Sequence, residues 1–218
     1  YPVESIIMST SPRRVLIFDC DNAGCLKNSF PQEDTFAFFA CDINEQLPRS
    51  PGLPLDLFSS CMTSPARTAL LWHSRHYYCF KEGPLCPLQF DFFEKAKPSI
   101  LDDVSIILHR YVEAMAFDVF ELELFLKVFR TDNVVAHLVS NFYFAVKILK
   151  FFVINPTSTP ELPDLSQHHL WQTFELRLDV ALQQIHAVTF SPSLSYQVFV
   201  EKTLLSMKHL MEVSMENL

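Results

Sequence analysis

Two proline-punctuated stretches limit which regular elements this chain can form. They are residues 95–99 (KAKPS) and 155–164 (NPTSTPELPD). A helix cannot run through either stretch, because proline lacks a backbone N–H and restricts the residue before it. The sequence therefore predicts a chain in two parts that meet near residue 97.

The first part alternates short apolar runs with turns. Residues 15–18 and 35–41 (TFAFFAC) are rich in β-branched and aromatic side chains, and residues 23–30 form a short, partly apolar connection. A strand, a short helix and a second strand favour a parallel pair. A helix is then expected to begin at Ser64-Pro65 and to reach Tyr77, since serine caps helices and proline suits their first position.

The second part is predicted to be helical throughout. Ser99 is the expected N-cap of its first helix, with Asp102 and Asp103 in the first turn. Consecutive helices with short loops and large apolar faces indicate a bundle or the start of an α-solenoid. The predicted helices cover residues 100–117, 119–130, 133–153, 166–187 and 191–215.

Composition narrows the class of protein. Of 218 residues, 49% are apolar, 21 are Phe and only 3 are Gly, which excludes a disordered chain and suggests large helix interfaces or a piece of something bigger. A net charge of −8 argues against a nucleic-acid partner or an anionic membrane surface. The six cysteines include no CxxC pair, so we expect reduced thiols and an intracellular protein.

The most apolar stretch, residues 134–154, is predicted to be a buried amphipathic helix. It contains His137, Lys147 and Lys150, and its apolar residues recur at helical spacing. A membrane span tolerates few charged residues, so membrane insertion is not expected.

A possible catalytic thiol lies in the turn FDCDNAG, residues 18–24. A cysteine nucleophile needs a lowered pKa and a partner base, usually histidine. The first histidine of the chain is His73, and the flanking Asp19 and Asp21 are expected to raise the pKa of Cys20. The turn is therefore predicted to be structural, or a former active-site turn, rather than a working nucleophile.

The remaining chemical candidates are weak. His73, His76 and Cys79 lie at i, i+3 and i+6, but nothing completes a tetrahedral zinc site, so an ordinary helix surface is expected. His168 and His169 are neighbours on a predicted helix and should point apart. The acid pairs Asp102-Asp103 and Glu121/Glu123 fit helix beginnings, and three glycines cannot build a phosphate loop. We predict no metal and no cofactor.

Several long blocks resemble the raptor family, the regulatory scaffold subunit of TOR complex 1. FDCDNAG is similar to the family's YDCSNAG turn. The similarity extends over roughly residues 13–207, through the blocks at 38–72, 124–149, 155–185 and 191–207.

The resemblance implies an architecture. Residues 1–97 would be the C-terminal part of a caspase-like α/β domain, and residues 98–218 the first helices of an armadillo-type solenoid. The turn residues Asp19, Cys20, Asp21, Asn22 and Gly24 would be vestigial. Asp21 replaces the family's serine, and by analogy with metacaspase-type turns the nucleophile position falls on either Cys20 or Asp21.

The resemblance also implies a function. Raptor-like proteins are non-enzymatic adaptors that present substrates carrying a TOR-signalling motif to the TOR kinase and dock on Rag-type GTPases. The expected location is the cytoplasm, with recruitment to the lysosomal surface. The substrate groove is expected within residues 79–110, around residues 79–93 and the helix from Ser99. Two alternatives stay open: a caspase-like cysteine peptidase with Cys20 as nucleophile, whose histidine would come from sequence outside this chain, and a generic helical-repeat adaptor.

Overall fold

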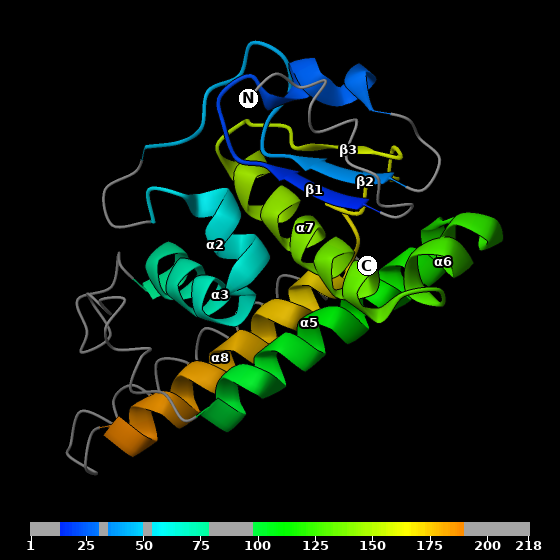
Figure 1. Ribbon diagram of the computed structural model, residues 1–218. Coiled ribbons are helices and arrows are strands. Elements are labelled where there is room, and N and C mark those ends of the chain that lie inside the picture. Colours follow the sequence, from blue (N-terminus) through cyan, green and yellow to red (C-terminus); the bar gives the residue numbers. More distant parts are fainter. Residues whose placement is uncertain (1–13, 31–34, 50–53, 79–97, 190–218) are drawn as a thin grey trace, which may run out of the picture.

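The computed structural model describes residues 14–30, 35–49, 54–78 and 98–189. The predicted helix at 191–215, the proline stretch up to residue 97 and the expected groove segment at 79–93 lie outside the described residues. Figure 1 shows a small sheet on one side of the molecule and a layer of helices packed below it.

The sheet has three strands in the order β1-β2-β3. Strand β1 (Arg14–Phe18) pairs in parallel with β2 (Thr35–Phe39), and the 3₁₀ helix η1 (Ala23–Ser29) lies between them in the chain. The predicted parallel pair is thereby confirmed. Strand β3 (Thr157–Thr159) pairs antiparallel with the other edge of β2.

Strand β3 lies in the proline stretch 155–164, where the sequence excluded a helix but did not predict a strand. Its three residues, Thr-Ser-Thr, lie between two prolines and carry no apolar pattern. They form a strand because they pair with the edge of β2 that β1 leaves free. Pairing of this kind depends on tertiary context rather than on local propensity.

Two short helices follow the sheet strands. They are α2 (Leu57–Thr63) and α3 (Pro65–His73), and the helix predicted to continue to Tyr77 changes at Ser74 into the π-helical turn η2 (Ser74–Tyr78). Pro65 takes the first helical position as expected, whereas the Ser64 side chain makes no capping hydrogen bond.

Four helices follow in the second part of the described chain, and α6 is the shortest of them. They are α5 (Pro98–Val119), α6 (Leu122–Phe129), α7 (Asn133–Phe151) and α8 (Leu170–Thr189). Helix α5 begins at Pro98, so Ser99 lies inside the helix rather than at its cap, and Asp102 and Asp103 follow the first turn. Helix α8 begins four residues later than predicted.

Helix α7 is the centre of the core. Its Phe142 ring lies 4.9 Å from the ring of Phe38 on β2 and meets Phe58 of α2 edge-on, while Asn141 Nδ2 donates to the carbonyl oxygen of Met62 at 2.8 Å. Segments from both sides of residue 97 therefore share one hydrophobic cluster. The predicted boundary at 97/98 is itself untested by this packing and stays a prediction.

By length and composition α7 is also the one helix among the described residues that could cross a membrane. Its apolar window is 61% buried inside the protein, as in the core helix of a soluble domain. The burial agrees with the predicted buried amphipathic helix. Taken together, the fold is mostly α with a small mixed sheet, which is the coarse class expected from the sequence.

Candidate functional site

The turn after β1 is held by backbone hydrogen bonds to the turn after β2. Asn22 adopts the left-handed conformation (φ 58°), and its N–H donates to the carbonyl oxygen of Glu45 at 2.9 Å. Oδ1 of Asp21 accepts from the N–H of Leu47 at 2.8 Å. The Asp21 carboxylate, one of the two candidate nucleophile positions, thus serves to fasten the two turns together.

Cys41, at the end of β2, lies under the same turn. Its buried thiol donates to the carbonyl oxygen of Cys20 at 3.3 Å, and its Sγ accepts from the N–H of Ala23 at 3.4 Å. Gly24 follows with no room for a side chain, because a Cβ there would lie 2.8 Å from Cα of Asp42. The glycine of FDCDNAG is therefore required by a close backbone approach.

Asp19 ties the turn to the helical layer. Its Oδ2 accepts from the N–H of Ser59 in α2 at 3.0 Å. Its other oxygen, Oδ1, is buried and has no hydrogen-bond partner among the described residues. The first carboxylate of the motif is consequently used in packing β1 on α2.

Cys20 itself is exposed, and its thiol is a poor nucleophile. Burial of part of the side chain raises the pKa of Cys20, and the nearby Cys25, Asp19 and Asp21 raise it further. The direction predicted from the two aspartates is confirmed. His73, the first histidine of the chain, has its Nε2 2.6 Å from Oδ1 of Asp179. That the turn carries no catalysis stays a prediction, which this geometry supports.

The histidines predicted to lie on helix surfaces are placed differently. His73 is buried and paired with Asp179 across α3 and α8, so the predicted surface position is wrong. The rings of His168 and His169 stack with centroids 4.4 Å apart, because these residues form the turn before α8 rather than helix. Cys79 lies outside the described residues. Within the described part of the chain, no group of three or more His, Cys, Asp or Glu side chains could hold a metal ion.

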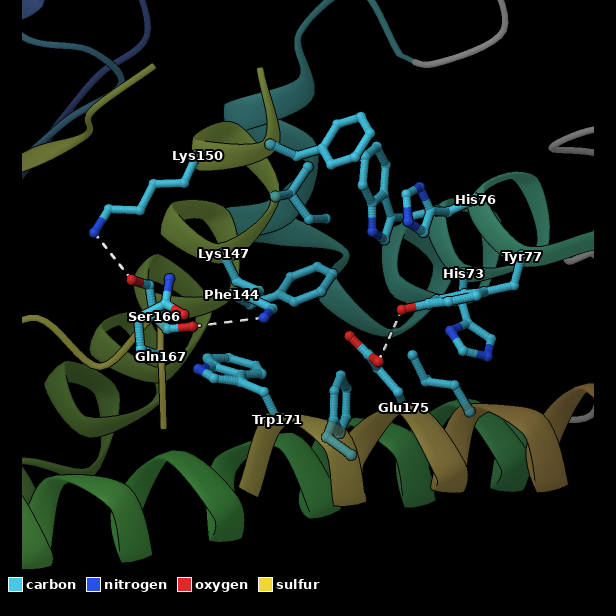
Figure 2. Close-up of a pocket in the computed structure, with 15 residues that line it drawn as sticks. His73, His76, Tyr77, Phe144, Lys147, Lys150, Ser166, Gln167, Trp171 and Glu175 are labelled. Atoms are coloured by element: carbon cyan, nitrogen blue, oxygen red, sulfur yellow. Dashed lines mark hydrogen bonds between the residues drawn. The ribbon is translucent and has the colours of Figure 1, made fainter. Parts of the chain in front are cut away.

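A pocket of about 290 Å³ lies between the α3–η2 segment, α7 and α8 (Figure 2). Its lining residue Tyr77 precedes, in the sequence, the segment 79–93 in which the substrate groove was expected and which lies outside the described residues. Aromatic rings form most of the wall, and two lysines and a glutamate project into it. The aromatic lining residues are Trp72, Tyr77, Phe144, Phe151, Trp171 and Phe174.

The lysines of the pocket differ in their partners. Lys150 Nζ donates to Oδ2 of Asp164 at 2.6 Å, and hydrogen bonds from Lys150 and the Ser166 backbone outweigh burial to lower the pKa of Asp164. Lys147 Nζ instead donates to the carbonyl oxygen of Ser166 at 3.5 Å, which is a neutral acceptor. In the pocket, the ammonium group of Lys147 therefore donates to an uncharged oxygen.

At the opposite side of the pocket, the Glu175 carboxylate already accepts a hydrogen bond. The Tyr77 hydroxyl donates to Oε2 of Glu175 at 2.9 Å (Figure 2). Burial, and then the Glu175 charge, raise the pKa of Tyr77, so this phenol stays protonated and keeps donating. The aromatic walls suit an apolar side chain of a ligand, and Lys147 suits a carboxylate beside it. Glu175 already accepts from Tyr77.

Sequence reasoning did not single out these pocket residues. Trp171, Phe174 and Leu178 recur at i, i+3 and i+7 on α8, and Phe144, Lys147 and Phe151 have the same spacing on α7. Such spacing marks one face of each helix. It does not say that the two faces meet at a hollow, which depends on how α7 and α8 cross.

No family model matches the chain. It is 29% identical over 198 residues to "Regulatory-associated protein of TOR 1" of Arabidopsis thaliana, covering 84% of this chain and 15% of that protein. It is 30% identical over 187 residues to "Target of rapamycin complex 1 subunit mip1" of Schizosaccharomyces pombe, covering 78% of this chain and 14% of that protein.

A solved structure agrees with these relatives. The crystal structure of Chaetomium thermophilum Raptor superposes with a TM-score of 0.69 at 27% identity, over 90% of this chain and 19% of that one. The chain spans less than a fifth of each of these proteins. Sequence and fold lead to the same group of proteins, and the chain belongs to the raptor family as a partial segment of it.

Proposed function

We propose that this chain is a segment of a non-enzymatic scaffold subunit of TOR complex 1, which recruits substrates to the TOR kinase. The observation that carries the proposal is the combined sequence and fold match to raptor proteins, one of which is named as a TOR complex 1 subunit. A scaffold of this kind acts by raising the local concentration of substrate near the kinase.

The turn geometry supports the non-enzymatic part of this proposal. The raised pKa of Cys20 suppresses its thiolate, while Asp19 and Asp21 accept backbone hydrogen bonds. A caspase-like peptidase would need the opposite electrostatics at this position. The turn is best understood as a strand end retained for structure.

The finer architecture forms part of the same proposal. The parallel pair β1-β2 with its short connecting helix, and the layer of α2 and α3, fit the C-terminal part of a caspase-like domain over residues 1–97. The adjacent α5 and α8, with α6 and α7, fit the first helices of an armadillo-type solenoid over residues 98–218. A generic helical-repeat adaptor would share only the second of these features.

The pocket in Figure 2 is the proposed seat of a substrate segment with a TOR-signalling motif. An acidic–hydrophobic peptide would place an apolar side chain against Trp72 and Phe174 and a carboxylate toward Lys147. The groove was expected within residues 79–110, and residues 79–97 of that region lie outside the described residues. Docking on Rag-type GTPases, and a cytoplasmic location with recruitment to the lysosomal surface, rest on the family resemblance alone.

The experiment has two arms. In the first, a full-length version of the protein is precipitated and TOR kinase is detected by immunoblot; absence of the kinase rejects the scaffold proposal. In the second, a fluorescent peptide with a TOR-signalling motif is titrated onto the protein. Lys147→Glu is expected to weaken peptide binding by about tenfold or more, because it reverses the charge facing the peptide carboxylate.

The matched control for the peptide titration is Lys127→Glu. Lys127 is an exposed lysine on α6, and its Nζ lies over the Phe36 ring rather than in the pocket. This variant makes the same change of charge and should bind the peptide as the parent does. Equal weakening by the two variants would point to a general charge effect and would rule out the pocket as the seat.

A further inference from the structure

Two histidine side chains are stacked where α5, α6 and α7 meet. The ring of His109 on α5 lies against the ring of His137 on α7, with centroids 4.2 Å apart and planes 28° from parallel. His137 is exposed, and His109 is partly buried. The ring of Phe129, at the end of α6, lies 6.3 Å from that of His109, so the pair touches all three helices.

Hydrogen bonding fixes where His109 carries its proton. Nδ1 of His109 lies 2.9 Å from Oγ of Ser140, and the Ser140 hydroxyl donates its single proton to the carbonyl oxygen of Ala136 at 2.9 Å. Ser140 Oγ must therefore accept, and His109 Nδ1–H must donate. Neutral His109 then has its free lone pair on Nε2, which is where a second proton would add.

The charges around His109 do not favour that second proton. Arg110 and Glu113 lie on α5, Arg130 follows α6, and His137 faces it from α7. Glu113 is the one carboxylate acting on His109, and it already pairs with both Arg110 (3.6 Å) and Arg130. An added positive charge on the imidazole would thus meet two arginines and a second imidazole with little compensation.

We propose that the stacked His109–His137 pair makes the packing of α5 on α7 sensitive to pH. With both rings neutral, the stack and the His109–Ser140–Ala136 hydrogen bonds hold the two helices together. In acid, a positive charge on the His109 imidazole would lie 4.2 Å from the second ring and close to Arg110 and Arg130, and it would loosen the contact. The contact between α5 and α7 is then pH-dependent, and it is separate from the pocket and from the turn after β1.

The direction of the effect follows from proton linkage. Burial first, then His137, lower the pKa of His109 from its ordinary value of 6.5. The folded chain consequently binds fewer protons than the unfolded chain in this range. Stability contributed by the pair is complete above pH 6.5 and is lost as the pH falls through the lowered pKa of His109.

The test is urea unfolding of the whole 218-residue chain at pH 7.5 and 5.5, comparing the parent with His109→Gln. Glutamine stays neutral at both values and keeps an N–H donor for Ser140. The parent unfolding constant is expected to rise by up to about tenfold more on acidification than that of the variant, the effect of at most one proton over the one pH unit between 6.5 and 5.5. Equal rises in the two proteins would overturn the proposal.

His169→Gln is the control. His169 is likewise stacked on a second imidazole, that of His168, but the pair lies in the turn before α8 rather than between helices. Its pH response should match the parent. NMR titration of the His109 ring in the parent gives a readout independent of any variant: a midpoint below 6.5 is expected, and a midpoint at or above 6.5 would refute the proposal.

Discussion

At the scale of single residues, the turn after β1 is explained by its contacts with neighbouring elements. Asp19, Asp21 and Gly24 are each explained by a backbone contact to α2 or to the turn after β2. Cys20 faces solvent with a raised pKa. The sequence predicted the direction of the Cys20 pKa shift correctly from the two aspartates, although partial burial, which the sequence does not show, is its largest cause. It did not reveal the donors to Asp21 and Asp19, which lie 26 and 40 positions further along.

Gly24→Ala is the sharpest residue-scale test of this account. A Cβ would lie 2.8 Å from both Cα and Oδ1 of Asp42, and backbone cannot move aside as a flexible side chain can. We expect the substitution to lower the free energy of unfolding by about 1–3 kcal/mol, the usual cost of overpacking. Urea unfolding followed by circular dichroism measures it.

Cys25→Ala is the matched control for Gly24→Ala. Cys25 is the next residue of η1 and is exposed, so its removal should change the free energy of unfolding by less than about 0.5 kcal/mol. If Gly24→Ala proved as stable as the control, the close approach to Asp42 would not be what fixes the glycine.

At the scale of elements, Glu45 links the turn after β2 to the segment between α7 and β3. Oε2 of Glu45 accepts from the N–H groups of Asp42 (2.9 Å) and Asn155 (2.8 Å), and Oε1 accepts from Asn155 Nδ2 at 2.7 Å. Asn155 lies between α7 and β3. This carboxylate therefore positions β3 for its pairing with β2, a long-range link that sequence patterns do not register.

Glu45→Gln should weaken that link in a pH-dependent manner. Burial tends to raise the pKa of Glu45, but the hydrogen bonds from Asn155 and Asp42 outweigh it and lower the pKa below its ordinary 4.5. Stability from this group is present above pH 4.5 and is lost as the pH falls through the lowered pKa. Glutamine should cost about 1 kcal/mol at pH 7 and flatten the acid limb of the stability profile.

Glu161→Gln provides the comparison for the acid limb. Glu161 pairs with Lys27 at 3.4 Å, but its side chain is 83% exposed, and exposed ion pairs contribute little. Its stability profile below pH 4.5 should follow the parent. An acid limb that is unchanged in Glu45→Gln would show that other carboxylates dominate in this range.

At the scale of the whole molecule, the two predicted parts depend on each other for a core. Phe142 of α7 packs between Phe38 of β2 and Phe58 of α2, and β3, from the second part of the chain, pairs with an edge of β2. Buried residues from both predicted parts belong to one hydrophobic cluster.

Residues 1–97 alone are therefore expected to lack a cooperative unfolding transition. Without α7 and β3, Phe38 and Phe58 lose contact with the Phe142 ring, and β2 loses the strand that pairs with one of its edges. Urea titration of the fragment and of the full chain, followed by circular dichroism, compares them directly. A cooperative transition of the isolated fragment would show that residues 1–97 fold independently of the helices that follow.

The sequence by itself determined two strands, several helix ends and the family resemblance of this protein. Prolines and β-branched or aromatic runs located β1, β2 and most helix boundaries, and several long blocks indicated the raptor family. These signals are local because backbone restriction and periodicity act over a few residues. Even there, Ser99 failed as a cap and the helix after Pro65 turned into η2 at Ser74.

Only the tertiary structure decided the rest. It delivered β3 to the edge of β2, buried His73 against Asp179 106 residues away, and brought the aromatic faces of α7 and α8 together around the pocket. It also stacked His109 on His137. Each of these contacts joins residues whose separation along the chain carries no periodic signal, so they arise only once the helices have packed.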